Sequence, residues 1–162
     1  MRILLALAVL AAVVAAGAAA ALDRAAVDRE GPEVTFPRGT ATLHTGTKTV
    51  KLWVELARTD VQRQQGLMHR RTLGPRAGMV FQYPSLTRGG FWMKNTLIPL
   101  DIAFYDGRGR ILRILQMKPC RADPCAVYDP GVAYRGALEV NAGSFRTLGV
   151  KRGHRLVVIP AR

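Results

Sequence analysis

The densest run of chemically active side chains in this 162-residue chain is the segment from Phe91 to Asp101. It holds two aromatic rings, a thioether, a cation, an amide, a hydroxyl and a carboxylate. Such a run can place its large apolar side chains in a core while its short polar ones line a concave surface, as in many ligand pockets. The alternative is that the aromatic residues and methionine are ordinary core, with Asn95-Thr96 a turn and Asp101 a carboxylate at a strand edge.

The first hypothesis predicts a domain that binds a small ligand or an envelope component at a concave site. An apolar or stacking wall, a cation for an anionic group and several hydrogen-bonding side chains would share this site. Its predicted ligand-binding residues are Trp92, Met93, Lys94, Asn95, Thr96, Asp101, Glu139 and Asn141.

Two carboxylates, Asp101 and Glu139, also suggest catalysis. Both lie at the edges of predicted strands, and a pair of carboxylates at the right separation hydrolyses glycosidic bonds. A hydrolase acting on envelope glycan or peptide, with these residues as acid and base, is therefore a second hypothesis. The simpler alternative is that both carboxylates are paired with arginines.

Cys120 and Cys125 are the only cysteines in the chain. An even count in an exported protein favours a disulfide. The bond would close a small loop and stabilise the fold by roughly 2 kcal/mol. The spacing C-R-A-D-P-C does not match a C-x-x-C redox motif. His44, His69 and His154 lie too far apart in the sequence to form a metal motif, so we expect no metal and no cofactor.

No G-x-S-x-G elbow, phosphate-binding loop or nucleic-acid module occurs in the sequence. Nucleic acid is therefore not an expected partner.

The first 21 residues have the pattern of a secretory signal peptide. Met1-Arg2 is a short positive region, Ile3 to Val14 is apolar, and Ala15 to Ala21 offers A-x-A cleavage sites. We therefore expect an exported protein, periplasmic, envelope-bound or secreted, with no stable membrane span after cleavage. The alternative is an uncleaved anchor, because the segment from Ile3 to Leu22 is just long enough to span a bilayer.

The chain is strongly basic, with 24 Lys and Arg against 11 Asp and Glu and a net charge of +13. Outside the cytoplasm such a charge would meet anionic lipid head groups or anionic envelope polymers. A third hypothesis is therefore an electrostatic module on an anionic envelope polymer, and the alternative is a solvated basic face. The residues proposed for this surface are Arg63, Arg70, Arg71, Arg76 and Arg88.

Periodicity predicts a mostly β domain that would position these side chains. Lys48 to Leu56 alternates as a half-buried strand does, and the capping box of Thr59 and Gln62 begins a helix from Asp60 to about Met68, ending early near Leu67. Further strands are expected at 78–83, 91–93, 100–105, 111–117, 134–141 and 155–159, with a long loop at 118–133 and a helical turn within 142–148.

The expected fold is a compact single-domain β sandwich or small barrel with one main short helix, and a β-rich α+β layout is the alternative. Residues 22–46 show little periodicity and are predicted to be a poorly ordered N-terminal arm. A single globular domain would then cover residues 47–162.

Several motifs along the chain carry a family resemblance. They are Gly66-Leu67-Met68-x-Arg70, Gly78-Met79-x-Phe81, the block from Phe91 to Asp101, the cysteine loop with Tyr128, and Leu138 to Gly143. Together they resemble the bacterial and archaeal family called domain of unknown function 192, over about Val50 to Val158. The resemblance implies a compact, mostly β single domain, often behind a signal peptide, and it supplies no catalytic residues.

Overall fold

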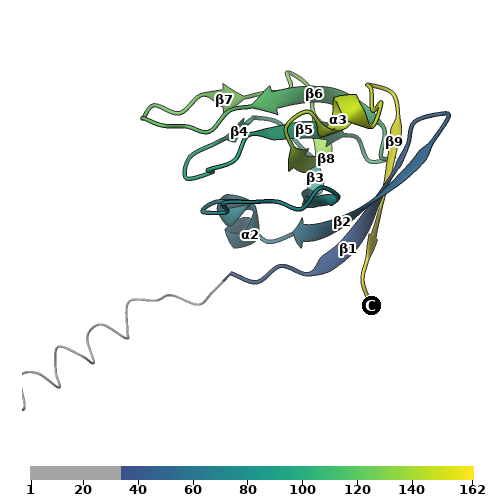
Figure 1. Cartoon of the computed structure of the whole chain (residues 1–162), viewed down its shortest axis with the longest axis horizontal. Helices are drawn as coiled ribbons and strands as arrows, with labels where there is room; N and C mark the ends of the chain where they lie inside the picture. Colours follow the sequence, from purple (N-terminus) through teal and green to yellow (C-terminus); the bar gives the residue numbers. More distant parts are fainter. Residues whose placement is uncertain (1–33) are drawn as a thin grey trace, which may run out of the picture. The chain divides into compact units, whose positions relative to one another are not determined.

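Residues 34–162 are described by the computed structural model, and Figure 1 shows that they form a strongly curled sheet with two short helices. The helices are α2 (Asp60–Gln65) and α3 (Ser144–Thr147). The strands are β1 (Arg38–His44), β2 (Thr49–Ala57), β3 (Ala77–Thr87), β4 (Phe91–Trp92), β5 (Leu100–Tyr105), β6 (Ile111–Met117), β7 (Val127–Tyr128), β8 (Tyr134–Asn141) and β9 (Arg155–Pro160). The predicted mostly β fold with one main short helix is confirmed. The predicted signal peptide, residues 1–21, lies outside the described residues.

Seven strands make the main sheet, in the order β6-β5-β8-β3-β2-β1-β9, while β4 and β7 pair in a separate ribbon. Neighbours in the main sheet are antiparallel, apart from the parallel pair β2 and β3, whose crossover connection contains α2. The two ends of the strand order meet at one point, where Ile111 N donates to His154 O at 2.8 Å and Gly153 N donates to Ile111 O at 2.8 Å. The sheet is therefore a half-barrel (Figure 1).

Each face of the main sheet carries its own apolar cluster. Side chains alternate between faces along a strand, so Val80 belongs to one cluster and its neighbours Met79 and Phe81 belong to the other. The second cluster is extended by Phe91 of β4 and by Leu67 from the loop after α2. The β4 strand and this loop therefore pack over one face of the sheet.

Helix α2 begins with the capping box that the sequence predicted. The Thr59 side chain accepts a hydrogen bond from Gln62 N, and the Gln62 side chain accepts one from Thr59 N. The helix ends at Gln65, slightly before the predicted end, because Gly66 takes a φ of 47° and a Cβ there would lie 3.3 Å from the Phe81 ring. Among residues 34–162, no helix has the length and apolar character needed to cross a membrane.

Two strands lie where the sequence predicted none. Strand β1 falls within the expected N-terminal arm, yet it pairs with both β2 and β9. Its buried positions are Gly39, Ala41 and Leu43, so only two apolar side chains mark its buried side. Strand β7 falls within the long loop at 118–133 and pairs only with β4. Strand β1 forms a hairpin with β2 and also pairs with the remote β9, while the partner of β7 lies far back in the sequence.

Candidate functional site

The segment from Phe91 to Asp101 runs from β4 through a tight turn into β5. In the turn, Thr96 N donates to Met93 O at 3.1 Å, and Asn95 takes a φ of 56°. The Asn95 carbonyl oxygen accepts from the N–H of His69, another residue with positive φ, at 2.8 Å. Left-handed backbone is uncommon for residues other than glycine and is well tolerated by asparagine. This bond therefore joins the turn after β4 to the loop after α2.

Between the turn and the loop lies a cavity of about 30 Å³. Helix α2 and its following loop form one wall, β4 and the turn form another, and the sheet closes the inner side. Its lining residues are Arg63, Gln64, Gln65, Gly66, Leu67, Met68, Phe81, Phe91, Trp92, Thr96 and Glu139. The space fits one small polar group, since a single water needs roughly half of it.

Glu139 is the acidic residue of this cavity. It lies on β8 directly between Met79 of β3 and Ile102 of β5, and only 4% of its surface is exposed. None of the hydrogen bonds found within residues 34–162 involves its side chain. Burial raises the pKa of the Glu139 carboxyl from 4.5 to about 8, because the charged form is poorly solvated there. At neutral pH the carboxyl is therefore mainly protonated, with an O–H donor and a carbonyl acceptor.

A surface groove of about 260 Å³ adjoins the cavity. Arg63, Gln64, Phe91 and Trp92 line both spaces, and Tyr83 adds a third ring to the groove. Trp92 is 54% exposed, so a large aromatic surface faces solvent at this point. The groove and cavity together form a site with an aromatic mouth and a carboxyl at its inner end.

The cations beside this site already have partners. Arg63 is paired with Asp60, donates to Gln82 O at 2.8 Å, and lies over the Tyr83 ring with its Cζ 4.9 Å from the centroid. Lys94 Nζ lies 3.0 Å from the Asp123 carboxylate. The site is thus locally close to neutral, although the whole chain carries a large positive charge.

Three of the predicted ligand-binding residues meet around the cavity: Trp92, Thr96 and Glu139. Thr96 is mostly buried, and its hydroxyl donates to Lys94 O at 3.4 Å. Two others, Met93 and Asn141, are not among the lining residues. Met93 is only 1% exposed in the apolar cluster.

Asn141 is bound to main-chain atoms. Its Nδ2 lies 2.9 Å from Leu73 O and 3.2 Å from Gly74 O, and donates to both. The two remaining polar residues of the turn are Lys94, paired as above, and Asn95, whose Nδ2 lies 4.0 Å from Met68 Sδ. These side chains therefore lie beside the cavity without lining it.

Asp101 lies on the other face of the sheet. It is paired with Val140, whereas Glu139 is paired with Ile102, and adjacent positions on a strand point to opposite faces. Asp101 accepts from Phe145 N at 3.3 Å and thereby anchors the start of α3. The predicted acid–base pair of Asp101 and Glu139 is therefore wrong, because the sheet separates the two carboxyls, and the hydrolase hypothesis built on it falls.

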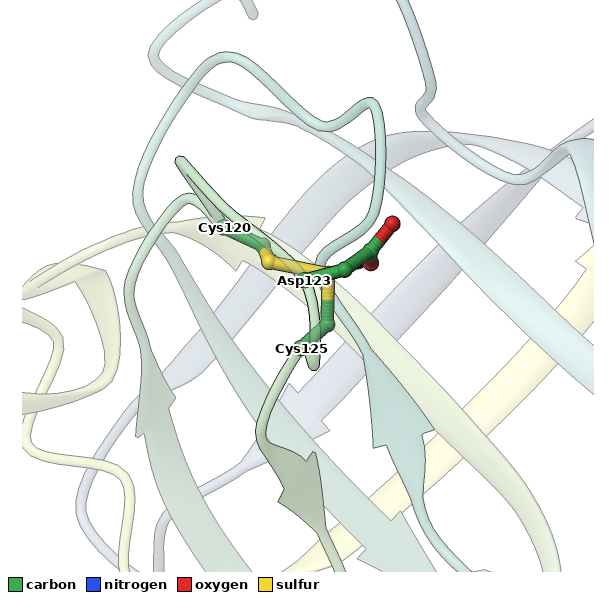
Figure 2. Close-up of side chains that lie close together, drawn as sticks. All are labelled: Cys120, Asp123 and Cys125. Carbon is green, nitrogen blue, oxygen red and sulfur yellow. Dashed lines mark hydrogen bonds between the residues drawn. A yellow bond between two sulfur atoms is a disulfide. The ribbon is translucent and has the colours of Figure 1, made fainter.

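Cys120 and Cys125 form the predicted disulfide, with their Cα atoms 5.5 Å apart (Figure 2). Figure 2 shows Asp123 close to the bond, and the Asp123 carboxylate and the two sulfurs lie within 4.8 Å of one another. A metal would need thiolate ligands, but both sulfurs are bonded to each other. The disulfide loop instead presents Asp123 to Lys94.

Sequence reasoning missed most of the outer wall of the site. Arg63, Gln64 and Met68 come from the α2 region, which is remote in sequence from Glu139. A signal was available, because Gly66-Leu67-Met68 and Phe91 belong to the motifs that carry the family resemblance. Motifs of one family that are far apart in sequence often meet at a common site.

The structure defines a single curled, mostly β domain with a small, partly aromatic site on one face of its sheet. The model of the family named DUF192, described as Uncharacterized ACR, matches residues 41–158. The chain belongs to this family, which confirms the resemblance found in its motifs.

Two solved structures are similar to this chain. A protein from Sinorhizobium meliloti 1021, named as a candidate transcription regulator, is 38% identical with a TM-score of 0.73, over 78% of this chain and 97% of that one. A protein of unknown function from Novosphingobium aromaticivorans DSM 12444 is 30% identical with a TM-score of 0.71, over 78% of this chain and 89% of that one. No curated protein matches the chain.

Proposed function

We propose that this domain binds a small ligand in the groove between α2 and β4, with Glu139 at the inner end. One observation carries the proposal: an almost fully buried carboxyl, without a hydrogen bond from residues 34–162, borders a cavity that adjoins an aromatic groove. No side-chain oxygen or nitrogen of residues 34–162 is both fully buried and without a hydrogen bond, so the Glu139 oxygens keep a small exposure where they border the cavity and are open to a partner that enters it. A carboxyl with a strongly raised pKa in a cleft is a common feature of functional sites.

The size of the groove favours a compact ligand. Its volume of about 260 Å³ lies just below the range usual for sites that take drug-sized molecules. The rings of Phe91, Trp92 and Tyr83 suit a planar or apolar portion, which would gain both buried area and ring contacts. A ligand of one ring or a few linked carbons with one polar end matches these features.

We also propose that the domain works outside the cytoplasm, on a ligand of the envelope or its surroundings. The Cys120–Cys125 disulfide supports this, since such bonds persist in oxidising compartments. The apolar pattern of residues 1–21 supports it independently. An electrostatic module on anionic polymer has less support, because Arg63 and Arg70 of its proposed surface are paired with Asp60 and Glu55.

Tryptophan fluorescence tests the site directly, because Trp53 and Trp92 are the two tryptophans of the chain. In W53F, Trp92 is the only emitter, and titration with a library of small aromatic and aliphatic compounds should find ligands that shift or quench its emission. The matched variant W92F keeps Trp53 as its only emitter and should not respond. Equal responses from both variants, or none from W53F across the library, would refute the proposal.

A further inference from the structure

The inner cavity has a donor and acceptor pattern that restricts the ligand's polar end. We infer that it takes a neutral head group with one hydrogen-bond acceptor and two donors, of which a primary carboxamide is the simplest example. This inference rests on the proposed function, because the remainder of such a ligand would occupy the adjoining groove. It adds the chemical class of the head group.

The cavity does not favour a cationic head group. Within residues 34–162, Arg63 is the one basic residue that lines the cavity. Its guanidinium is paired with Asp60 and donates to the carbonyl oxygens of Arg58 and Gln82. An ammonium would have to lose much of its hydration and ionise Glu139 within a narrow space, which is costly for both charges. The carboxyl instead stays protonated, as its solvent-excluded position predicts.

The groups around the cavity also do not favour an anion. A carboxylate offers only acceptors, whereas Glu139 supplies a single O–H donor. Arg63 is paired with Asp60 and lies over the Tyr83 ring, so part of its positive charge is already neutralised by groups outside the cavity. Gln64 and Gln65 add neutral amides at the wall formed by α2.

Thr96 completes the pattern. Its hydroxyl donates to Lys94 O at 3.4 Å, which leaves the lone pairs of its oxygen as acceptors. Glu139 and Thr96 are the buried polar side chains of the lining, and together they offer one donor, the Glu139 O–H, and two acceptors, the Glu139 carbonyl and Thr96 Oγ1. The amides of Gln64 and Gln65 are more exposed and keep access to water. A primary carboxamide has one carbonyl acceptor and two N–H donors, so every buried polar group could be satisfied at once.

Three compounds with the same ring and different head groups test the inference: benzamide, benzylamine and benzoate. Titrated into W53F at neutral pH, benzamide should bind at least about tenfold tighter than the two charged compounds, as the loss of one or two buried hydrogen bonds implies. With E139L added, the three affinities should lie within about twofold of one another, since only ring contacts remain. E139Q, which keeps a donor and an acceptor, should restore most of the preference for benzamide.

The pH dependence separates hydrogen bonding by the protonated acid from a general packing role. With Glu139 intact, benzamide affinity should fall as pH rises through about 8, and with E139Q it should stay flat. The other titratable groups near this carboxyl are Arg63 on α2 and Tyr83 on β3, and burial raises the pKa of Tyr83. D101N, altered on the opposite face, is the matched control and should keep both the preference and its pH dependence.

Tighter binding of benzylamine, or no dependence of any affinity on position 139, would overturn the inference. If all three compounds shift Trp92 emission equally through their rings, the proposed groove stands and the head-group inference fails. If none binds, the carboxamide class is excluded, and the library titration alone decides the proposed function. Thermal melting of each variant should show that the fold is intact before affinities are compared.

Discussion

Glu139 shows how the position of one residue on a strand decides its chemistry. Its neighbours Leu138 and Val140 point into one apolar cluster, and Glu139 points to the other face beside Met79. An apolar residue at this position would pack without cost, so the carboxyl lowers stability wherever it is charged. A residue that is costly for the fold is the kind expected at a site with another purpose.

The cost of the Glu139 charge gives a prediction about stability. The folded protein holds this proton more tightly than the unfolded chain does, because the carboxyl pKa is about 8 in the fold against 4.5. The contribution of this proton to the free energy of unfolding is therefore fully present below pH 4.5 and is lost as pH rises through about 8. The loss is at most about 5 kcal/mol. Urea unfolding of the native protein and of E139Q across this range should give a difference that grows with pH. A constant difference would show that Glu139 is ionised throughout.

The sequence identified Glu139 as a site residue but paired it with the wrong carboxylate. Asp101 and Glu139 both lie near strand ends, and only the register of β5 against β8 places them on opposite faces. A shift of one residue in that register would have put them on the same face. Residue types and spacing could predict which side chains were unusual, and the pairing between strands decided which of them meet.

Helix α2 is a short element on which the outer wall of the site depends. Gln62 holds its first turn in place: its Oε1 accepts from Arg58 N at 2.9 Å and Thr59 N at 3.1 Å, and its Nε2 donates to Thr35 O at 2.8 Å. A helix of six residues has little stability of its own, so these contacts and the packing of the following loop maintain it.

Removal of the cap should weaken both the fold and the site. T59A should lower the free energy of unfolding by about 1 kcal/mol, because Gln62 N loses its acceptor, while T59S should be close to the native protein. T59A should also weaken ligand binding to the groove, since Arg63 and Gln64 are carried by this helix. Urea denaturation and Trp92 titration measure the two effects. Unchanged ligand affinity in a destabilised T59A would show that the wall does not need the cap.

The elements were predictable to different degrees for physical reasons. Strand β2 was found because Leu52, Val54 and Leu56 mark its buried side, a clear two-residue period. Strand β1 was missed because its buried side consists of Gly39, Ala41 and Leu43, which give only two apolar side chains and a weak two-residue period. The pairing with β9 also specifies this strand, and that information lies in the tertiary structure.

At the scale of the whole molecule, the net charge of +13 contrasts with the near-neutral surroundings of the site. Arg63 and Lys94 beside the groove are each paired with an acidic residue, and Arg70 is paired with Glu55. The excess positive charge is therefore spread over other parts of the chain. It would affect solubility and encounters with anionic surfaces more than it affects recognition in the groove.

This contrast predicts different responses to salt. Ligand affinity in the groove should change less than about twofold between about 0.1 M and about 1 M NaCl, whereas adsorption to dextran sulfate should weaken strongly as the Debye length shrinks. Both can be measured on the same W53F protein, by fluorescence titration and by retention on immobilised polymer. Groove binding that falls in parallel with adsorption would mean that general charge attraction explains both.

The incomplete closure of the half-barrel has a consequence for self-association. Within residues 34–162, main-chain bonds cross between this end of the sheet and β9 only from residues 109–111 to residues 153–156, so most of the outer edge of β6 presents main-chain groups that another extended chain could pair with. Exposed Arg113 lies in the middle of this strand. When two copies approach edge to edge, their arginines would face each other, and like charges on edge strands oppose such pairing. We therefore expect Arg113 to oppose the growth of a continuous intermolecular sheet.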